Sequence, residues 1–205
     1  MPQFAHLTTL QPFVTACRLC ALRTQAAHVV FGTGVPTSRI VFCGEAPGAD
    51  EDAQGQPFVG KSGQLLDQLL KAMGFHRAAN TYLLNVVKCR PPNNRRPTPD
   101  EVQTCFPHAI AQLGLIHPAI IVTLGATATQ AFFPDSPPIS QARGHWQTWQ
   151  DIAIMPTYHP AAMLRNPTWK REAWEDMKRV LDRYRTDVDA HHDAPGYPLP
   201  SSDAG

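Results

Sequence analysis

The strongest constraint on the fold is the alternation of short apolar runs with longer segments of helical pattern. Four runs are apolar on both faces and rich in β-branched residues: Arg39–Cys43, Tyr82–Val87, Ala119–Leu124 and Ile152–Met155. Four helical patterns lie between and after them: Ser62–Met73, Thr98–Leu115, Ala126–Phe133 and Trp169–Tyr184. Strands that alternate with helices predict a parallel sheet covered on both faces. We therefore expect an α/β fold, a three-layer α/β/α sandwich with a central four-stranded parallel sheet.

Chain length sets the domain organisation. A chain of 205 residues is long enough for one well-buried core and short for two, so we expect a single domain over residues 1–185. Residues 186–205 lack apolar periodicity, and we predict a disordered tail there. The sequence has no uninterrupted apolar run of about 18 residues and no secretory signal pattern at its start. We therefore expect a cytoplasmic protein without a membrane partner, and a monomer by default.

The location of the chemistry follows from the expected sheet. Ligands of open parallel sheets bind beyond the carboxyl ends of the strands. The segments that follow the four predicted strands are GEAPGADEDAQGQPF, KCRPPNNRRP, GATATQ and PTYHPAAMLRNP, and three of them are rich in proline, glycine and polar residues. The net charge of +1 excludes a uniformly basic coat, so any contact with a nucleic acid must come from a local patch.

The cysteines indicate a metal centre. Cys17 and Cys20 form a C-x-x-C pair, Cys89 follows a predicted strand, and Cys105 lies within the next predicted helix. Thiolates from such distant segments can converge on one centre, and both zinc and an iron–sulfur cluster are chemically possible. Unrelated buried thiols are the simpler alternative. Cys43 ends an apolar strand, and we expect it to be a buried hydrophobic residue.

Four motifs together resemble the family 4 uracil-DNA glycosylases, the iron–sulfur branch found in bacteria and archaea. They are CRLC at Cys17–Cys20, GEAPGADEDAQGQPFVGKSGQLLD at Gly44–Asp67, NVVKCRPPNNRRPTPDEVQTC at Asn85–Cys105, and HPAAMLRNP at His159–Pro167. The resemblance covers roughly Ala16 to Tyr184. It implies a DNA repair enzyme that flips uracil out of double- or single-stranded DNA and hydrolyses the N-glycosidic bond, leaving an abasic site. It also implies that Cys17, Cys20, Cys89 and Cys105 hold a structural [4Fe–4S] cluster.

The resemblance assigns the pocket that receives the flipped base. Phe58 is expected to be the face on which uracil stacks, although a core aromatic residue is the simpler interpretation. Asn85 interrupts an apolar strand, and its amide can donate to uracil O4 and accept from N3–H, which disfavours cytosine. A buried structural amide is the alternative. His159 precedes a proline, which favours an extended backbone that could direct its ring to uracil O2.

Further residues are expected around the sugar and the DNA. Glu45 is the candidate catalytic acid, and Asn94 is expected to orient it. Ala46, which follows Glu45, is expected to line the uracil pocket but cannot act in catalysis. Glu51 is expected to border uracil C5, with a solvated loop acid as the alternative. Leu164 and Arg165 fit a loop that enters the minor groove. The expected phosphate contacts are Lys88, Arg90, Arg95 and Arg96, unless these residues simply form a solvated loop.

Three other functions compete with the glycosylase. An iron–sulfur electron carrier explains the cysteines but leaves Phe58, Asn85 and His159 as coincidences. A related protein that traps uracil-DNA covalently is expected to carry a histidine in the loop after the third cysteine, and RPPNNRRP has none. A zinc-stabilised binding module is the third alternative.

Overall fold

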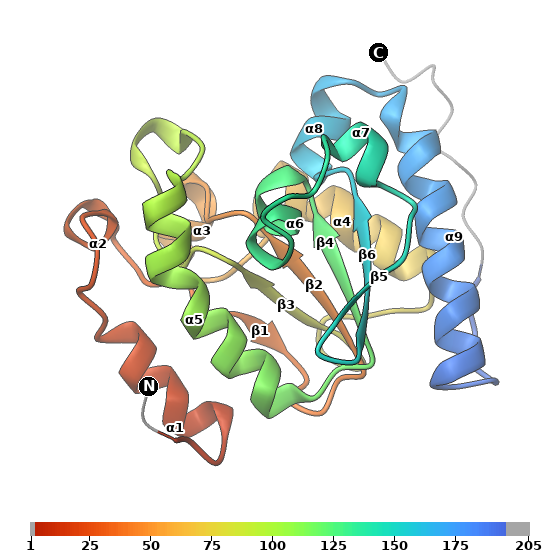
Figure 1. The fold of residues 1–205 in the computed structure, drawn as a ribbon, viewed down its shortest axis with the longest axis horizontal. Helices are drawn as coiled ribbons and strands as arrows, with labels where there is room; N and C mark the ends of the chain where they lie inside the picture. Colours follow the sequence, from red (N-terminus) through yellow and green to blue (C-terminus); the bar gives the residue numbers. More distant parts are fainter. Residues whose placement is uncertain (1–2, 196–205) are drawn as a thin grey trace.

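A computed structural model describes residues 3–195 as one α/β unit (Figure 1). Its α-helices are α1 (Leu7–Thr15), α2 (Leu22–Gln25), α3 (Ala49–Gln54), α4 (Lys61–Ala72), α5 (Pro99–Ile116), α6 (Ala126–Phe132), α7 (Ile139–Ala142), α8 (Pro160–Arg165) and α9 (Trp169–Asp187). Its strands are β1 (Thr33–Gly34), β2 (Ile40–Gly44), β3 (Tyr82–Asn85), β4 (Ile120–Leu124), β5 (Gln147–Trp149) and β6 (Ile152–Thr157), and a short 3₁₀ turn, η1, spans Pro92–Asn94.

The sheet has six strands in the order β1-β3-β2-β4-β6-β5. The four predicted strands are its parallel centre, β3-β2-β4-β6, while β1 and β5 pair antiparallel on the two edges. The prediction of an α/β sandwich is confirmed, but the predicted sheet of four strands lacks the two edge strands, β1 and β5. The edge strands are two and three residues long, too short for a periodic pattern to reveal them.

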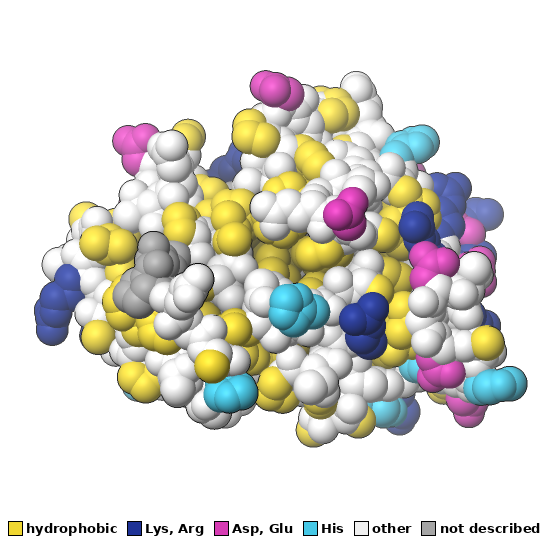
Figure 2. All heavy atoms as spheres, turned by 60° about the horizontal axis from the view of Figure 1, so that its bottom comes forward, with side chains coloured by type: hydrophobic (Ala, Val, Ile, Leu, Met, Phe, Trp, Pro, Cys, Tyr) yellow, Lys and Arg dark blue, Asp and Glu magenta, His cyan; other side chains and the backbone are white. Residues whose placement is uncertain are grey.

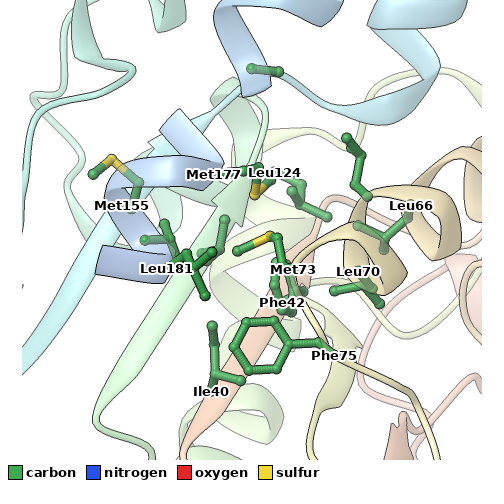
Figure 3. Packing of buried hydrophobic residues seen from close by; sticks show 14 of the residues in the cluster. Ile40, Phe42, Leu66, Leu70, Met73, Phe75, Leu124, Met155, Met177 and Leu181 are labelled. Carbon is green, nitrogen blue, oxygen red and sulfur yellow. The ribbon is translucent and has the colours of Figure 1, made fainter. Parts of the chain in front are cut away.

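Side chains alternate along each central strand and build a separate core on each face of the sheet. In β2, Ile40 and Phe42 pack with α4 and α9, whereas Val41 and Cys43 pack with α1 and α5. Figure 3 shows the first of these cores, where Phe42 and Phe75 lie beside Leu70 and Met73. Cys43 is fully buried, which confirms its prediction as a core residue.

Two of the three long predicted helices, α4 and α5, have recognisable residues at their ends. Thr98 caps α5 because its Oγ1 accepts from the backbone N–H of Glu101 (3.3 Å), and the Glu101 carboxylate accepts from the N–H of Thr98 (2.8 Å). Gly60 precedes α4, which ends before the left-handed Gly74. None of the helices in residues 3–195 is long and apolar enough to cross a membrane.

The chain beyond Tyr184 packs against the domain. Helix α9 continues to Asp187, and the ring of His192 then stacks on Phe75 with centroids 4.4 Å apart. His192 Nε2 also lies 2.7 Å from the Met73 carbonyl oxygen. The structure thus places contacts with the core beyond residue 185, the predicted end of the domain, and a single buried histidine is not a periodic signal that the sequence could reveal. Residues 196–205 of the predicted tail lie outside the described residues.

Candidate active site

A cavity of about 840 Å³ opens at the carboxyl ends of the central strands. Glu45 follows β2, Asn85 ends β3, Gly125 follows β4, and His159 follows β6, and all four residues line the cavity. In Figure 1 this is the upper end of the sheet, beside α6 and α8. The cavity brings together most of the predicted site residues: Glu45, Ala46, Glu51, Phe58, Asn85, Asn94, Arg95, Arg96, His159, Leu164 and Arg165.

Phe58 forms an aromatic wall of the cavity. Its side chain is buried, and its ring is roughly parallel to that of His159, with an interplanar angle of 30° and centroids 6.2 Å apart. Gly44 makes this placement possible, because a Cβ there would lie 2.6 Å from Phe58 Cζ and 2.5 Å from Asn85 Oδ1. The end of β2 therefore needs a residue without a side chain.

Asn85 presents a buried acceptor that finds no partner in the part of the chain that the structure describes. The residue is 2% exposed, and its Oδ1 has no hydrogen-bond partner among the described residues. Buried polar atoms in native proteins are generally paired, so an unpaired one in a cavity wall points to a ligand that supplies the donor. The purely structural interpretation of this amide does not account for the unpaired oxygen.

His159 is held as a neutral ring with a defined tautomer. Its Nδ1 accepts a hydrogen bond from the backbone N–H of Ala161 at the start of α8 (3.1 Å). Burial, reinforced by the nearby positive charge of Arg165, lowers the pKa of His159 to about 4, although Glu51 acts in the opposite direction. In a neutral ring whose Nδ1 accepts, the proton lies on Nε2, which is therefore a donor.

The partner of Glu45 is a residue that sequence analysis missed. Thr127, in the first turn of α6, donates its hydroxyl proton to Glu45 Oε2. Thr127 Oγ1 in turn accepts from Arg96 Nε (2.8 Å), and Arg96 Nη2 donates to Gln130 Oε1 (2.6 Å). The chain runs from β2 to β3 on one side of the sheet and from β4 to β6 on the other, so the switch point of the sheet lies between β2 and β4. The bond between Thr127 and Glu45 crosses this point.

Asn94 and Glu51 make contacts that differ from those expected. Asn94 Oδ1 accepts from Arg90 Nε (2.7 Å), so Asn94 is tied to the cysteine loop, while Thr127 holds Glu45. Glu51 is buried, and its carboxylate accepts from the backbone N–H groups of Gly48 (3.0 Å), Val59 and Gly60 (both 2.9 Å). The alternative of a solvated acid at Glu51 is therefore wrong.

The predicted phosphate contacts separate into buried and accessible groups. Lys88 is 1% exposed and donates to the Phe31 carbonyl oxygen (3.1 Å), so its place among the DNA-binding residues is corrected. Arg95 forms an ion pair with Glu101 but keeps a side chain that is 42% exposed. On the face drawn in Figure 2, basic and acidic side chains are interspersed, in keeping with the net charge of +1.

The four spaced cysteines influence one another. Burial, together with Cys105, Cys20 and Cys17, raises the pKa of Cys89 to about 12. The Lys88 backbone N–H donates to Cys105 Sγ (3.2 Å), and His108 Nε2 lies 3.2 Å from Cys17 Sγ. In the described part of the chain, no group of three or more His, Cys, Asp or Glu side chains is arranged to hold a metal ion as it stands.

Comparisons with known proteins identify the family. Residues 31–178 match the Uracil DNA glycosylase superfamily. The chain is similar to the type-4 uracil-DNA glycosylase of Thermotoga maritima, with 44% identity over 82% of this chain and 88% of that protein. It is also similar to the type-4 enzyme of Sulfurisphaera tokodaii, with 40% identity over 86% of this chain and 84% of the relative. The protein therefore belongs to the uracil-DNA glycosylase superfamily, in its type-4 branch.

Proposed function

We propose that this chain is a DNA repair enzyme that hydrolyses the bond between uracil and deoxyribose in DNA, leaving an abasic site. The observation that carries the proposal is the unpaired Oδ1 of Asn85, buried in the wall of a cavity that Phe58 and His159 also line. A base can reach such a cavity only after leaving the stack, at a cost of a few kcal/mol.

Asn85 and Phe58 are proposed to recognise the flipped base. Asn85 Oδ1 can accept from uracil N3–H, and its amide nitrogen can donate to O4. Cytosine presents an acceptor at N3 and a donor at C4, the reverse of what this amide offers. The ring of Phe58 supplies an apolar face on which a planar base can stack.

His159 and Glu45 are proposed to act on the bond that breaks. As the bond lengthens, negative charge grows on uracil O2 and positive charge on the sugar. A neutral His159 can donate from Nε2 to O2 without first losing or gaining a proton, and such preorganised donors are a large catalytic term. The Glu45 carboxylate, held at Oε2 by Thr127, leaves Oε1 to position water or to stabilise the cationic sugar.

DNA contact is proposed to occur around the mouth of the cavity. Leu164 lines the cavity and is 43% exposed, which suits an apolar wedge that fills the gap left by the flipped nucleotide. Arg165, Arg90, Arg95 and Arg96 stay the proposed phosphate contacts. Ala46 and Glu51 stay proposed borders of the base pocket, and Asn94 a support of the same site.

The donor set of Cys17, Cys20, Cys89 and Cys105 fits a [4Fe–4S] cluster. All four are thiols, and they come from three segments close enough to affect one another's ionisation. The Lys88 backbone N–H donates to Cys105 Sγ, and His108 Nε2 lies beside Cys17 Sγ. The cluster would link the N-terminal segment to β3 and α5 as a structural cross-link. We further propose that the enzyme acts in the cytoplasm as a monomer.

Release of free uracil from a labelled oligonucleotide tests the proposed function. We expect purified, brown, folded protein to release uracil from U·G pairs, U·A pairs and single strands without added cofactor. A matched oligonucleotide with thymine at the same position is the control and should stay intact. A folded, brown sample that releases no uracil at any protein concentration would refute the enzyme and favour a binding or redox role.

A further inference from the structure

Phe58 has a backbone conformation that is unusual for an aromatic residue. Its φ is +56°, in the left-handed region, where a residue with a Cβ is disfavoured. Such conformations persist only where the surrounding structure holds them, and they are concentrated at functional sites. The position of the Phe58 ring therefore depends on the contacts that hold the peptide groups before and after Phe58.

Arg77 binds the carbonyl side of this backbone. It lies in the segment between α4 and β3, and its Nη1 donates to the Pro57 carbonyl oxygen (2.8 Å). Its Nη2 donates to the Phe58 carbonyl oxygen. The guanidinium Nε donates to Asp67 on α4, which fixes the plane of the group and balances its charge. The planar guanidinium has several donors arranged as a fork, so it can bind the two carbonyl oxygens and the Asp67 carboxylate at once. A lysine ammonium cannot reproduce this geometry.

Two other contacts hold the same backbone. The N–H groups of Val59 and Gly60, which follow Phe58, both donate to Glu51 Oε1 (2.9 Å each). Gly63 packs directly on Phe58, because a Cβ at Gly63 would lie 1.9 Å from the Phe58 carbonyl oxygen. Arg77 is absent from the described residues that line the cavity, so any influence on a bound base must pass through this backbone.

We propose that Arg77 is a positioning residue for base recognition: by binding the Pro57 and Phe58 carbonyls, it keeps Phe58 left-handed and its ring in the cavity wall. The inference rests on the proposed function, in which the Phe58 ring stacks on the flipped base. It adds a residue that contacts neither the base nor the cavity, and it predicts an effect on uracil affinity that a general stabilising role would not give.

Binding of free uracil, measured by calorimetry, tests the proposal without requiring turnover. We expect Arg77→Met to weaken uracil binding roughly tenfold, the scale of one lost base–aromatic stacking contact. Arg77→Lys, which keeps the charge but loses the fork, should weaken binding by a smaller factor. Arg39→Met is the matched control, because Arg39 also donates to a backbone carbonyl, that of His117 (2.9 Å), on an exposed surface. It should bind uracil like the wild type.

A double-mutant cycle separates action through Phe58 from a general loss of stability. If Arg77 acts through Phe58, Arg77→Met should add little to the loss already caused by Phe58→Ala. Circular dichroism should show every variant folded at the assay temperature. If Arg77→Met does not fold, Arg77→Lys takes its place in the cycle. Wild-type uracil affinity in a folded Arg77 variant, or fully additive losses in the cycle, would overturn the inference. Failure of the wild type to release uracil would instead refute the proposed function.

Discussion

His159 shows how local bonding determines a chemical role. The Ala161 N–H occupies Nδ1, and burial keeps the pKa near 4, so the ring is neutral at physiological pH with its proton on Nε2. We expect His159→Ala to lower the rate of base release by about 10² to 10³, with a much smaller loss of DNA affinity. The factor should be the same at pH 6 and pH 8, since the ring stays neutral at both. Single-turnover rates and binding curves test this; a factor that shrinks as pH rises would indicate an imidazolium.

Asn85→Asp tests the assignment of the base reader. A carboxylate has nearly the shape of the amide but offers only acceptors, so uracil O4 would face a second acceptor. Each mismatched buried polar group costs about 1–3 kcal/mol, so we expect uracil release to fall at least tenfold. Some activity should appear on mismatched or single-stranded cytosine, provided that this base can be flipped. Wild-type uracil activity in Asn85→Asp would show that Asn85 does not read the base.

Thr127 offers a test of the bonds that hold Glu45. Arg96 donates to Thr127 Oγ1, so the single hydroxyl proton is left for the Glu45 carboxylate. Thr127→Val keeps the shape but removes both bonds, and we expect the single-turnover rate of base release to fall by about tenfold. Thr127→Ser restores the hydroxyl and should recover most of the rate. Equal rates for the valine and serine variants would mean that the hydroxyl does not support catalysis.

At the scale of elements, the predicted strands and helices were found where periodicity extends over several residues. The runs beginning at Arg39 and Ala119 became β2 and β4, each within a residue at either end, because strands buried on both faces are continuously apolar. Edge strand β1 is Thr33–Gly34, which carries no pattern. Short helices such as α8 were missed because the motif HPAAMLRNP indicates a loop as readily as a turn of helix.

Those residues of the candidate site that were predicted from the sequence are unusual residues in regular elements. An asparagine within the apolar run YLLNVV and a histidine before a proline stand out from their surroundings. Thr127 and Arg77 did not stand out, because a threonine in a short helix and an arginine in a polar loop are ordinary. Their proposed roles rest on contacts across 82 residues to Glu45 and across 19 residues to Phe58, which only the folded chain reveals.

The cysteine-bearing elements provide a prediction about the cluster. Cys105 on α5 and Cys43 on β2 belong to the same hydrophobic core. Burial, together with Cys20 and Cys17, raises the pKa of Cys105, whereas burial accounts for the raised pKa of Cys43 and no other cysteine contributes to it. We expect Cys105→Ala to lose most of its iron and brown colour and to become poorly soluble. Cys43→Ala should keep its iron, colour and activity. Iron content per protein and the visible absorbance spectrum measure this, and a fully coloured, iron-loaded Cys105→Ala variant would refute the ligand set.

At the scale of the whole molecule, the segment after α9 extends the core beyond the expected boundary. His192 is buried against Phe75 and lies 2.7 Å from the Met73 carbonyl oxygen, whereas the neighbouring His191 is exposed. Stacking and one hydrogen bond together suggest that His192→Ala lowers the free energy of unfolding by about 1–3 kcal/mol. His191→Ala is the control and should leave it unchanged. Denaturant titration measures the free energy of unfolding of both variants. If His192→Ala is as stable as the wild type, the segment after α9 does not contribute to the stability of the fold.

The unpaired oxygen of Asn85 has a consequence for the thermodynamics of the folded state. In the unfolded chain, water hydrates this amide, whereas in the folded chain its oxygen is buried and none of residues 3–195 donates to it. A base whose N–H reaches this oxygen therefore makes a hydrogen bond that no described residue of the protein makes. A ligand that donates to Asn85 Oδ1 binds the native state and not the unfolded chain, so it raises the melting temperature by mass action. Selectivity between bases then becomes a property of protein stability as well as of catalysis.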